Sequence, residues 1–319
     1  MGKRFLCLLA AAAALTLPAA PAIRQRTIAG RNCCSLDDLL TLNRFLVRQT
    51  GGTLSASGRG MVLRFERNQR RFLCNGFRVE LCFPPAFDGA SPYLSVLDWR
   101  KVLRPLLFPA TVPSHPVRTV YLDMGHGGAD PGALGAFSRE KDLTLALGRK
   151  VAALLTRDGF KVVMTRNSDV LAPLARIGQL QRQSKSDLFV SIHVNSAADR
   201  TISGIETYCL TPAGAASSNG GKNKDRTHPG NRFDANNLVL AWHIHRAVLN
   251  NTAATDRGIK RARFAVLRDL NAPGVLIAVG FISNRAEEKR LNRSDYQDKI
   301  ARGIVAGIVS YRRSLSKKP

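Results

Sequence analysis

Two histidines and one glutamate stand where the chain could bring their side chains onto one ion. His126 follows the apolar segment 117–122, His193 ends the apolar segment 188–193, and Glu140 opens a segment with helical periodicity. In open α/β folds the carboxyl ends of strands and the starts of helices meet at one sheet edge. Two imidazoles and a carboxylate make a three-ligand zinc set that leaves a fourth position for water. These residues therefore predict a hydrolytic zinc site, although His126 taken alone could equally be a buried, hydrogen-bonded histidine.

The segments around these residues alternate between strand-like and helix-like patterns. We expect strands at 118–123, 161–165, 188–192, 203–210, 263–268 and 275–280. We expect helices at about 139–158, 171–184, 234–250 and 294–313. This alternation predicts an α/β fold, a three-layer α/β/α catalytic domain with a mostly parallel sheet, over residues 117–314.

A smaller α+β domain is expected before it, over residues 33–108. After a polar, basic leader at 23–32, a helix should begin at Ser35 and run until Gly51-Gly52 stops it. Alternating residues then predict a β-meander with an Asn75-Gly76 hairpin turn, closed by a short helix at 97–103. The segment 109–116, rich in proline, is the expected linker.

The first 22 residues have the pattern of a secretory signal peptide. A basic start is followed by a short apolar stretch and by small residues suited to cleavage. No later segment is apolar enough to span a membrane. The chain is therefore expected to be exported to the periplasm or cell envelope.

The formal charge of +25 at pH 7 indicates polyanionic surroundings or a polyanionic partner. An export signal argues against nucleic acid, and the basic residues are spread along the chain without interleaved stacking aromatics. Anionic wall polymer or membrane headgroups fit this charge better.

Cys74 and Cys82 look like a disulfide pair, but the hairpin register argues against it. With Asn75-Gly76 as the turn, Cys74 lies opposite Phe77, and about five residue pairs separate it from Cys82. That separation is roughly 17 Å, beyond the reach of a disulfide. We expect these two cysteines not to be joined.

Several motifs in order resemble the zinc-dependent N-acetylmuramoyl-L-alanine amidases of bacterial cell walls. They are Asp123-Met-Gly-His-Gly-Gly, Glu140-Lys-Asp, Thr165-Arg166, Ser191-Ile-His-Val-Asn195, Gly204-Ile-Glu-Thr-Tyr208, Arg257-Gly-Ile-Lys260, Val266-Leu-Arg268 and Gly280-Phe-Ile-Ser-Asn284. The resemblance covers about residues 117–312 and implies zinc held by His126, Glu140 and His193. It also implies peptidoglycan as the substrate, cut between the lactyl group of muramic acid and L-alanine. More loosely, residues 35–108 resemble the small domain at the head of copper amine oxidases and of several wall hydrolases. This second resemblance implies a role in binding cell wall for the small domain.

One residue departs from the family pattern. The last strand in the family usually carries a glutamate that acts as general base, and here Ala278 takes its place in Val275-Leu-Ile-Ala-Val-Gly-Phe281. Losing a positioned general base typically costs a factor of about 10² to 10⁴ in rate. Glu206, on the strand after His193, is a candidate substitute.

Arg166, Arg176 and Asn195 are the expected substrate contacts, the two arginines through carboxylates of the stem peptide. Surface ion pairs are the alternative for the arginines. Three functions remain open: an active zinc amidase, a zinc-binding relative that is weak or silent and binds peptidoglycan, and a generic zinc peptidase of the same fold class. The ordered motifs favour the first, and Ala278 motivates the second. A regulatory protein partner is also left open.

Overall fold

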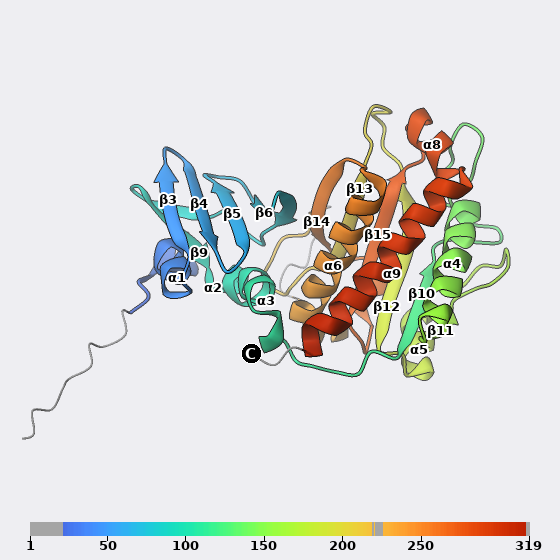
Figure 1. Ribbon diagram of the computed structural model, residues 1–319, viewed down its shortest axis with the longest axis horizontal. Coiled ribbons are helices and arrows are strands. Elements are labelled where there is room, and N and C mark those ends of the chain that lie inside the picture. Colours follow the sequence, from blue (N-terminus) through green and yellow to red (C-terminus); the bar gives the residue numbers. More distant parts are fainter. Residues whose placement is uncertain (1–21, 219, 221–225, 317–319) are drawn as a thin grey trace, which may run out of the picture.

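The computed structural model describes residues 22–218, 220 and 226–316, so most of the expected signal peptide lies outside the described residues. Two sheets are present, a four-stranded sheet in the order β1-β2-β9-β8 and an eleven-stranded sheet. The large sheet has the order β11-β10-β12-β15-β13-β14-β7-β6-β5-β4-β3 and spans the molecule (Figure 1). None of the helices in the described part of the chain is long and apolar enough to cross a membrane.

Residues 119–281 supply six strands of the large sheet. They are β10 (Thr119–Met124), β11 (Lys161–Met164), β12 (Leu188–Asn195), β13 (Ile205–Leu210), β14 (Asp256–Ala262) and β15 (Gly274–Phe281). Among these six, only the β13–β15 pair is antiparallel. The predicted mostly parallel sheet is therefore confirmed.

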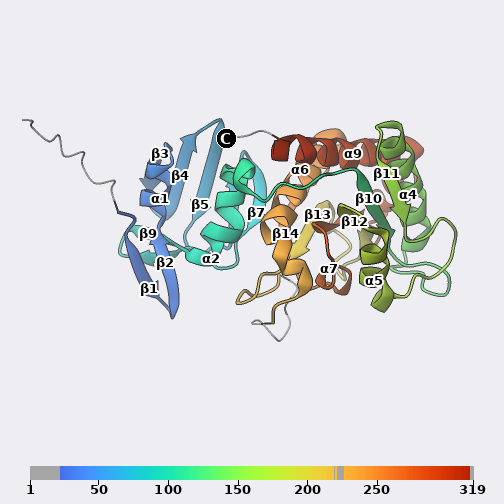
Figure 2. The same ribbon diagram turned by 90° about the horizontal axis from the view of Figure 1, so that it is seen from below.

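Helices cover both faces of these six strands. They are α4 (Glu140–Arg157), α5 (Leu174–Ser184), α6 (Asp234–Thr252), α7 (Ala265–Arg268), α8 (Arg285–Leu291) and α9 (Ser294–Ser316). Figure 2 shows α4, α6 and α9 on one side of the sheet and α5 and α7 on the other. The apolar residues of the strands alternate between the two sides, so that Val275 and Ile277 face the large core while Leu276 faces the smaller one. The predicted three layers are present.

The expected strand at 263–268 is wrong. The strand is β14, which ends at Ala262, and residues 265–268 form α7. Val266 and Leu267 bury their side chains in the smaller core beside Ile177 of α5. Apolar residues in so short a segment fit a buried helical turn as well as a strand.

The first part of the chain forms the small sheet and the remaining strands of the large one. Its elements are β1 (Gln25–Ile28), β2 (Arg31–Ser35), α1 (Leu36–Leu42), β3 (Leu46–Thr50), β4 (Thr53–Gly58), β5 (Met61–Glu66), β6 (Arg71–Cys74), β7 (Phe77–Glu80), β8 (Ala86–Asp88), β9 (Ser91–Ser95), α2 (Val96–Asp98), a π-helical turn (Trp99–Leu103), α3 (Arg104–Leu107) and a 3₁₀ turn (Pro109–Thr111). The Asn75-Gly76 hairpin and the closing helix are confirmed.

Two expectations for this region are wrong. The helix capped by Ser35 ends at Leu42, because Arg44 takes a left-handed conformation (φ +64°) and Leu46–Thr50 then pairs with β4. The leader expected before the folded part, at 23–32, belongs to the fold, since β1 and β2 form a hairpin there.

The five cysteines in the described residues are free and buried. Cys74 pairs with Phe77 in the hairpin register. The prediction that Cys74 and Cys82 are not joined is confirmed.

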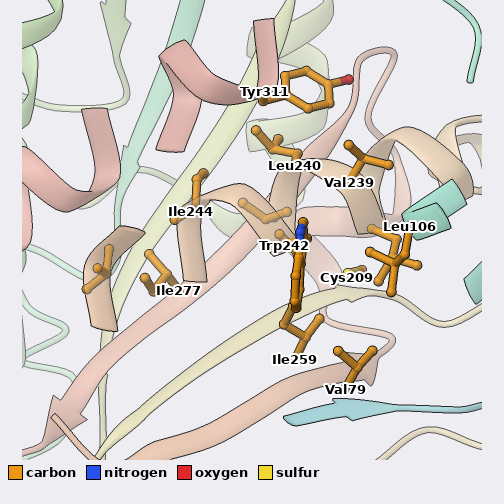
Figure 3. Packing of buried hydrophobic residues seen from close by; sticks show 14 of the residues in the cluster. Val79, Leu106, Cys209, Val239, Leu240, Trp242, Ile244, Ile259, Ile277 and Tyr311 are labelled. Atoms are coloured by element: carbon orange, nitrogen blue, oxygen red, sulfur yellow. The ribbon is translucent and has the colours of Figure 1, made fainter. Parts of the chain in front are cut away.

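The two parts of the chain share one core as well as one sheet. Strand β7 pairs with β14 in parallel at Val79 and Ile259. Figure 3 shows Val79 and Ile259 packed in the same cluster as Trp242 of α6 and Leu106 of α3. The predicted segment 109–116 therefore connects two units that are already joined through the sheet.

Candidate metal centre

Three side chains converge where β10 and β12 end and α4 begins. His126 lies just after β10, Glu140 is the first residue of α4, and His193 lies near the end of β12. One ligand atom from each lies within 4.8 Å of the others. His126 Nε2 is 3.2 Å from Glu140 Oε2, and His193 Nδ1 is 2.9 Å from Glu140 Oε1. Ligand atoms on a tetrahedral zinc lie about 3.4 Å apart, so the donor set fits that ion with small adjustments.

Glycines make room for this arrangement. A Cβ on Gly125 would lie 2.3 Å from Cε1 of His193, and one on Gly132 would lie 2.6 Å from Cδ2 of His126. His126 itself has a φ of +67°, which β-substituted residues rarely adopt. The glycine-rich loop is thus shaped around the two imidazoles.

Glu140 is buried and held in place by backbone groups. Ala133 N–H donates to its Oε2 at 2.9 Å, and Val194 N–H donates to its Oε1 at 2.8 Å. Although burial opposes the shift, hydrogen bonds from His126 and His193 lower the pKa of Glu140. The carboxylate is therefore charged and ready to bind a cation.

Asp130 orients the first imidazole. Its Oδ2 lies 2.7 Å from Nδ1 of His126, and its Oδ1 accepts from Gly132 N–H at 3.0 Å. This contact leaves Nε2 facing the ligand cluster, as a carboxylate beside a metal-binding histidine commonly does. The hydrogen bond with Glu140 is the main reason why the pKa of His126 is raised to about 9. Burial opposes this shift, and the hydrogen bond with Asp130 adds to it. The sequence analysis missed Asp130, whose signal is its place four residues after His126 in the glycine-rich loop.

Arg166 fixes the backbone on either side of the glycine-rich loop. It is 3% exposed, and its guanidinium donates to the carbonyl oxygens of Met124, Gly125, Lys141 and Ser168. These bonds tie the end of β10 to the start of α4, which carry two of the three ligands. Arg166 therefore positions the ligand-bearing segments and does not line the pocket.

A pocket of about 550 Å³ opens above the three ligands. Its wall is largely apolar and includes Leu171, Leu174, Ile177, Phe264, Val266 and Leu276. Among the described lining residues the acidic groups are Asp130 and Glu140, and Asn195 and Ser196 supply polar groups. Arg176 is exposed on α5 and does not line this pocket.

Ala278 has a candidate metal ligand as its neighbour on one adjacent strand and a glutamate as its neighbour on the other. On β15 it pairs with His193 of β12 on one side and with Glu206 of β13 on the other. Paired residues project from the same face of a sheet. A longer side chain at position 278 would therefore start between His193 and Glu206, and the methyl group of Ala278 is fully buried.

Glu206 is saturated with hydrogen-bond donors. Its Oε1 accepts from Arg257 Nε at 2.9 Å and from Lys260 Nζ at 2.6 Å. Its Oε2 accepts from Asn195 Nδ2 at 2.7 Å and from the Tyr208 hydroxyl. Although burial opposes the shift, these bonds, Lys260 first, lower the pKa of Glu206. The bond from Asn195 bridges β15 on the face that carries Ala278.

Two histidines and a glutamate that could hold a metal ion, placed where the strands of an α/β sheet end, are typical of metal-dependent hydrolases. The sequence model of the N-acetylmuramoyl-L-alanine amidase family matches residues 120–310. The chain therefore belongs to this family, and the membership supports the hydrolase activity expected from the motifs.

Individual relatives agree with the family. N-acetylmuramoyl-L-alanine amidase AmiC of Escherichia coli is 36% identical over 259 residues, which cover 73% of this chain and 58% of AmiC. The chain thus spans somewhat more than half of that relative. The catalytic domain of the amidase CwlV from Bacillus (Paenibacillus) polymyxa var. colistinus is 32% identical, with a TM-score of 0.52, over 61% of this chain and 97% of that one. Amidase AmiC2 of Nostoc punctiforme is 30% identical, with a TM-score of 0.53, over 63% of this chain and 99% of that one.

Proposed function

We propose that this chain is a zinc-dependent amidase that cleaves peptidoglycan between the lactyl group of N-acetylmuramic acid and L-alanine of the stem peptide. The observation that carries the proposal is the convergence of His126, Glu140 and His193 in a pocket on the sheet edge. Two imidazoles and a carboxylate suit zinc, and Asp130 gives His126 the orientation that such a ligand needs.

In this proposal the residues of the chain have two roles, binding and positioning. His126, Glu140 and His193 would hold a zinc ion, which when bound would supply Lewis-acid polarisation of the amide carbonyl and would lower the pKa of water to about 7. Leu171, Leu174 and Ile177 form an apolar wall against which the lactyl and alanine methyl groups can pack while water is excluded. Asn195 lines the pocket, and because its Nδ2 donates to Glu206, its amide oxygen is the atom that can accept a hydrogen bond from the substrate. Arg176, exposed on α5, is a candidate contact for a more distant stem carboxylate.

Ala278 predicts that this amidase is slow. The position offers no proton acceptor, and Glu206 beside it accepts four hydrogen bonds, two of them from cations. A carboxylate with a lowered pKa and filled lone pairs is a poor general base. These two observations favour a second candidate function, a zinc-binding relative that binds peptidoglycan and cleaves it weakly or not at all.

The proposal places the chain in the cell envelope. Peptidoglycan lies outside the cytoplasmic membrane, and the first 22 residues have the pattern of a secretory signal peptide. The expected wall-binding role of the first unit fits this location. A regulatory protein partner, which was left open, would also act in the cell envelope.

Metal analysis and a cleavage assay on purified sacculi test the proposal together. We expect about one zinc per chain and slow release of free stem peptides. His193→Ala should lose both, whereas His115→Ala, which changes a histidine outside the pocket, should keep both. A properly folded chain that binds no zinc contradicts the proposal. Zinc binding without any release of stem peptides supports the second candidate function.

A further inference from the structure

The side-chain amide of Asn195 is held in one direction. Asn195 ends β12 and lines the pocket, and its Nδ2 donates to Oε2 of Glu206 on β13 at 2.7 Å. The bond crosses β15, which lies between these two strands, on the face where Ala278 carries only a methyl group. Among the residues that the structure describes, none is hydrogen-bonded to Oδ1 of Asn195. The wall of the pocket therefore contains an amide oxygen that is available to a ligand.

Glu206 sets this direction because its carboxylate can only accept hydrogen bonds. Although burial opposes the shift, hydrogen bonds, that from Lys260 first, lower the pKa of Glu206, so the group is ionised at neutral pH. An ionised carboxylate has no proton to donate. If the amide of Asn195 turned around, its oxygen would face an oxygen of Glu206 with no proton between them. The NH₂ group of Asn195 must therefore point at Glu206.

Two cations determine which oxygen of Glu206 meets Asn195. Oε1 accepts from Arg257 Nε at 2.9 Å and from Lys260 Nζ at 2.6 Å, and both donors come from β14. Oε2 accepts from Asn195 and from the hydroxyl of Tyr208. The two oxygens of the carboxylate therefore have different kinds of partner, cations on one side and neutral donors on the other.

The free oxygen of Asn195 lies beside the candidate metal ligands. Asn195 follows His193 by two residues on β12, about 6.6 Å along a strand, and both side chains line the same pocket. In a trans secondary amide the carbonyl oxygen and the N–H point in opposite directions. An amide whose carbonyl oxygen faces the metal ligands therefore directs its N–H away from them, where an acceptor on the pocket wall can receive it.

We propose that Asn195, held by Glu206, is a specificity-determining residue that accepts a hydrogen bond from the N–H of the amide joining the lactyl group to L-alanine. Glu206 acts through Asn195 and is a positioning residue. The inference rests on the proposed function, because it takes the same amide as the ligand. The site then selects secondary amides, which have this proton, over tertiary amides and esters, which lack it.

A nearly isosteric substitution, Glu206→Gln, should reverse the amide of Asn195. The oxygen of the new side chain should stay beside Arg257 and Lys260, because these two cations only donate hydrogen bonds. Its NH₂ group then faces Asn195, and the Asn195 amide turns so that its oxygen accepts this proton. The pocket thereby receives a donor in place of an acceptor.

Nuclear magnetic resonance tests the direction of the amide without any ligand. The side-chain NH₂ group of Asn195 gives a pair of signals in proton–nitrogen correlation spectra, identified by their loss in Asn195→Ala. In the natural chain one proton of the pair should exchange slowly with water, because Glu206 holds it. In Glu206→Gln both protons should exchange fast, because they face the open pocket. Equal exchange in the two chains would overturn the proposal.

Calorimetry tests the specificity with the zinc-loaded chain. The ligands are N-acetylmuramoyl-L-alanyl-D-isoglutamine and the same molecule methylated on the alanine nitrogen. Methylation should weaken binding to the natural chain by about 10-fold or more, the size of one hydrogen bond left unmade in a pocket. This penalty should be about 10-fold smaller in Glu206→Gln and in Asn195→Ala, because neither presents the acceptor. Glu66→Gln, which removes an exposed acid outside the pocket, should keep the full penalty.

The remaining outcomes separate this inference from the proposed function. A purely structural role of Glu206 would weaken the binding of both ligands alike, and an equal methylation penalty in all the chains overturns the inference while the proposed function stands. A natural chain that binds zinc but neither binds nor cleaves the unmethylated ligand contradicts the proposed function, and the exchange experiment still decides the direction of the Asn195 amide. Zinc content and thermal unfolding report whether each variant keeps its metal site and its fold.

Discussion

The backbone at His126 takes a left-handed conformation. A φ of +67° in a residue with a Cβ is uncommon and persists where the surrounding structure holds it. Here Asp130 holds the ring, Arg166 holds the carbonyl oxygens of Met124 and Gly125, and Gly127 and Gly128 follow with positive φ values. The site is therefore prepared before any ion binds.

At the residue scale, a substitution at Gly125 tests whether the surrounding backbone holds the candidate ligands in place. Gly125→Ala places a methyl group 2.3 Å from Cε1 of His193, so the ring must move out of line with Glu140. We expect zinc affinity to fall by 10-fold or more while the fold is retained. Competition with a chelator measures the affinity. Gly159→Ala strains its own backbone (φ +80°), but its Cβ meets nothing within 4 Å; it is the control for a destabilised fold and should leave the affinity unchanged.

Ala278 is the second test at this scale. Ala278→Glu places a carboxylate between His193 and Glu206, where it can accept a proton from a water near the ligands. We expect the rate of stem-peptide release to rise by roughly 10²-fold, the size typical of a positioned base. Ala278→Gln, of similar size but without a basic group, should show no such gain. Equal and high activity in all three chains would mean that another group already serves as the base.

At the scale of elements, α8 secures the loop that leads into α4. Glu288 accepts from the backbone N–H groups of Ala136, Phe137 and Ser138 at 2.9–3.0 Å and from the Ser138 hydroxyl at 2.8 Å. Although burial opposes the shift, these bonds lower the pKa of Glu288. A lowered pKa in the folded state stabilises the fold above the unfolded value of about 4.3, and this contribution is lost as the pH falls.

Glu288→Gln measures that contribution. At pH 7 the substitution should lower the free energy of unfolding by about 1–3 kcal/mol, the range for leaving buried donors poorly matched. Below about pH 4 the difference should shrink, because the glutamate of the natural chain becomes protonated. Urea unfolding at both pH values gives the two differences. A difference that stays constant with pH would show that the charge of Glu288 contributes nothing.

At the scale of the whole molecule, the joint between the two units is built from backbone, charge and apolar contacts. Arg78 N–H donates to Asp256 at 2.8 Å, Lys101 pairs with Asp234 at 3.2 Å, and the ring of Phe77 meets Trp242 edge-on at 5.9 Å. Such a joint does not act as a flexible tether between independent domains.

We therefore expect the two units to unfold together. Far-UV circular dichroism and the fluorescence of Trp99 and Trp242 should follow a single coincident transition. Phe77→Ala should lower the free energy of unfolding by about 1–3 kcal/mol and leave that transition single. Two separate transitions in the natural chain would show that the shared sheet does not couple the units.

The sequence by itself determined most elements of the second unit, with β14 as an exception, and the three candidate ligands. His126, Glu140 and His193 could be chosen because each stands at a strand end or a helix start, and these positions are encoded by local apolar periodicity. The Asn75-Gly76 turn and the separation of Cys74 from Cys82 could also be predicted from the local sequence, because a two-residue turn sets the register of its hairpin.

The tertiary structure decided what depends on residues far apart in the chain. β14 escaped prediction because its face is polar: Lys260 binds Glu206 and Arg261 is buried among groups from other elements. The four donors around Glu206 come from β12, β13 and β14, so neither its lowered pKa nor its unavailability as a base can be read from one segment. The pairing of β7 with β14 joins residues about 180 positions apart, and periodicity carries no information about which strand edges meet.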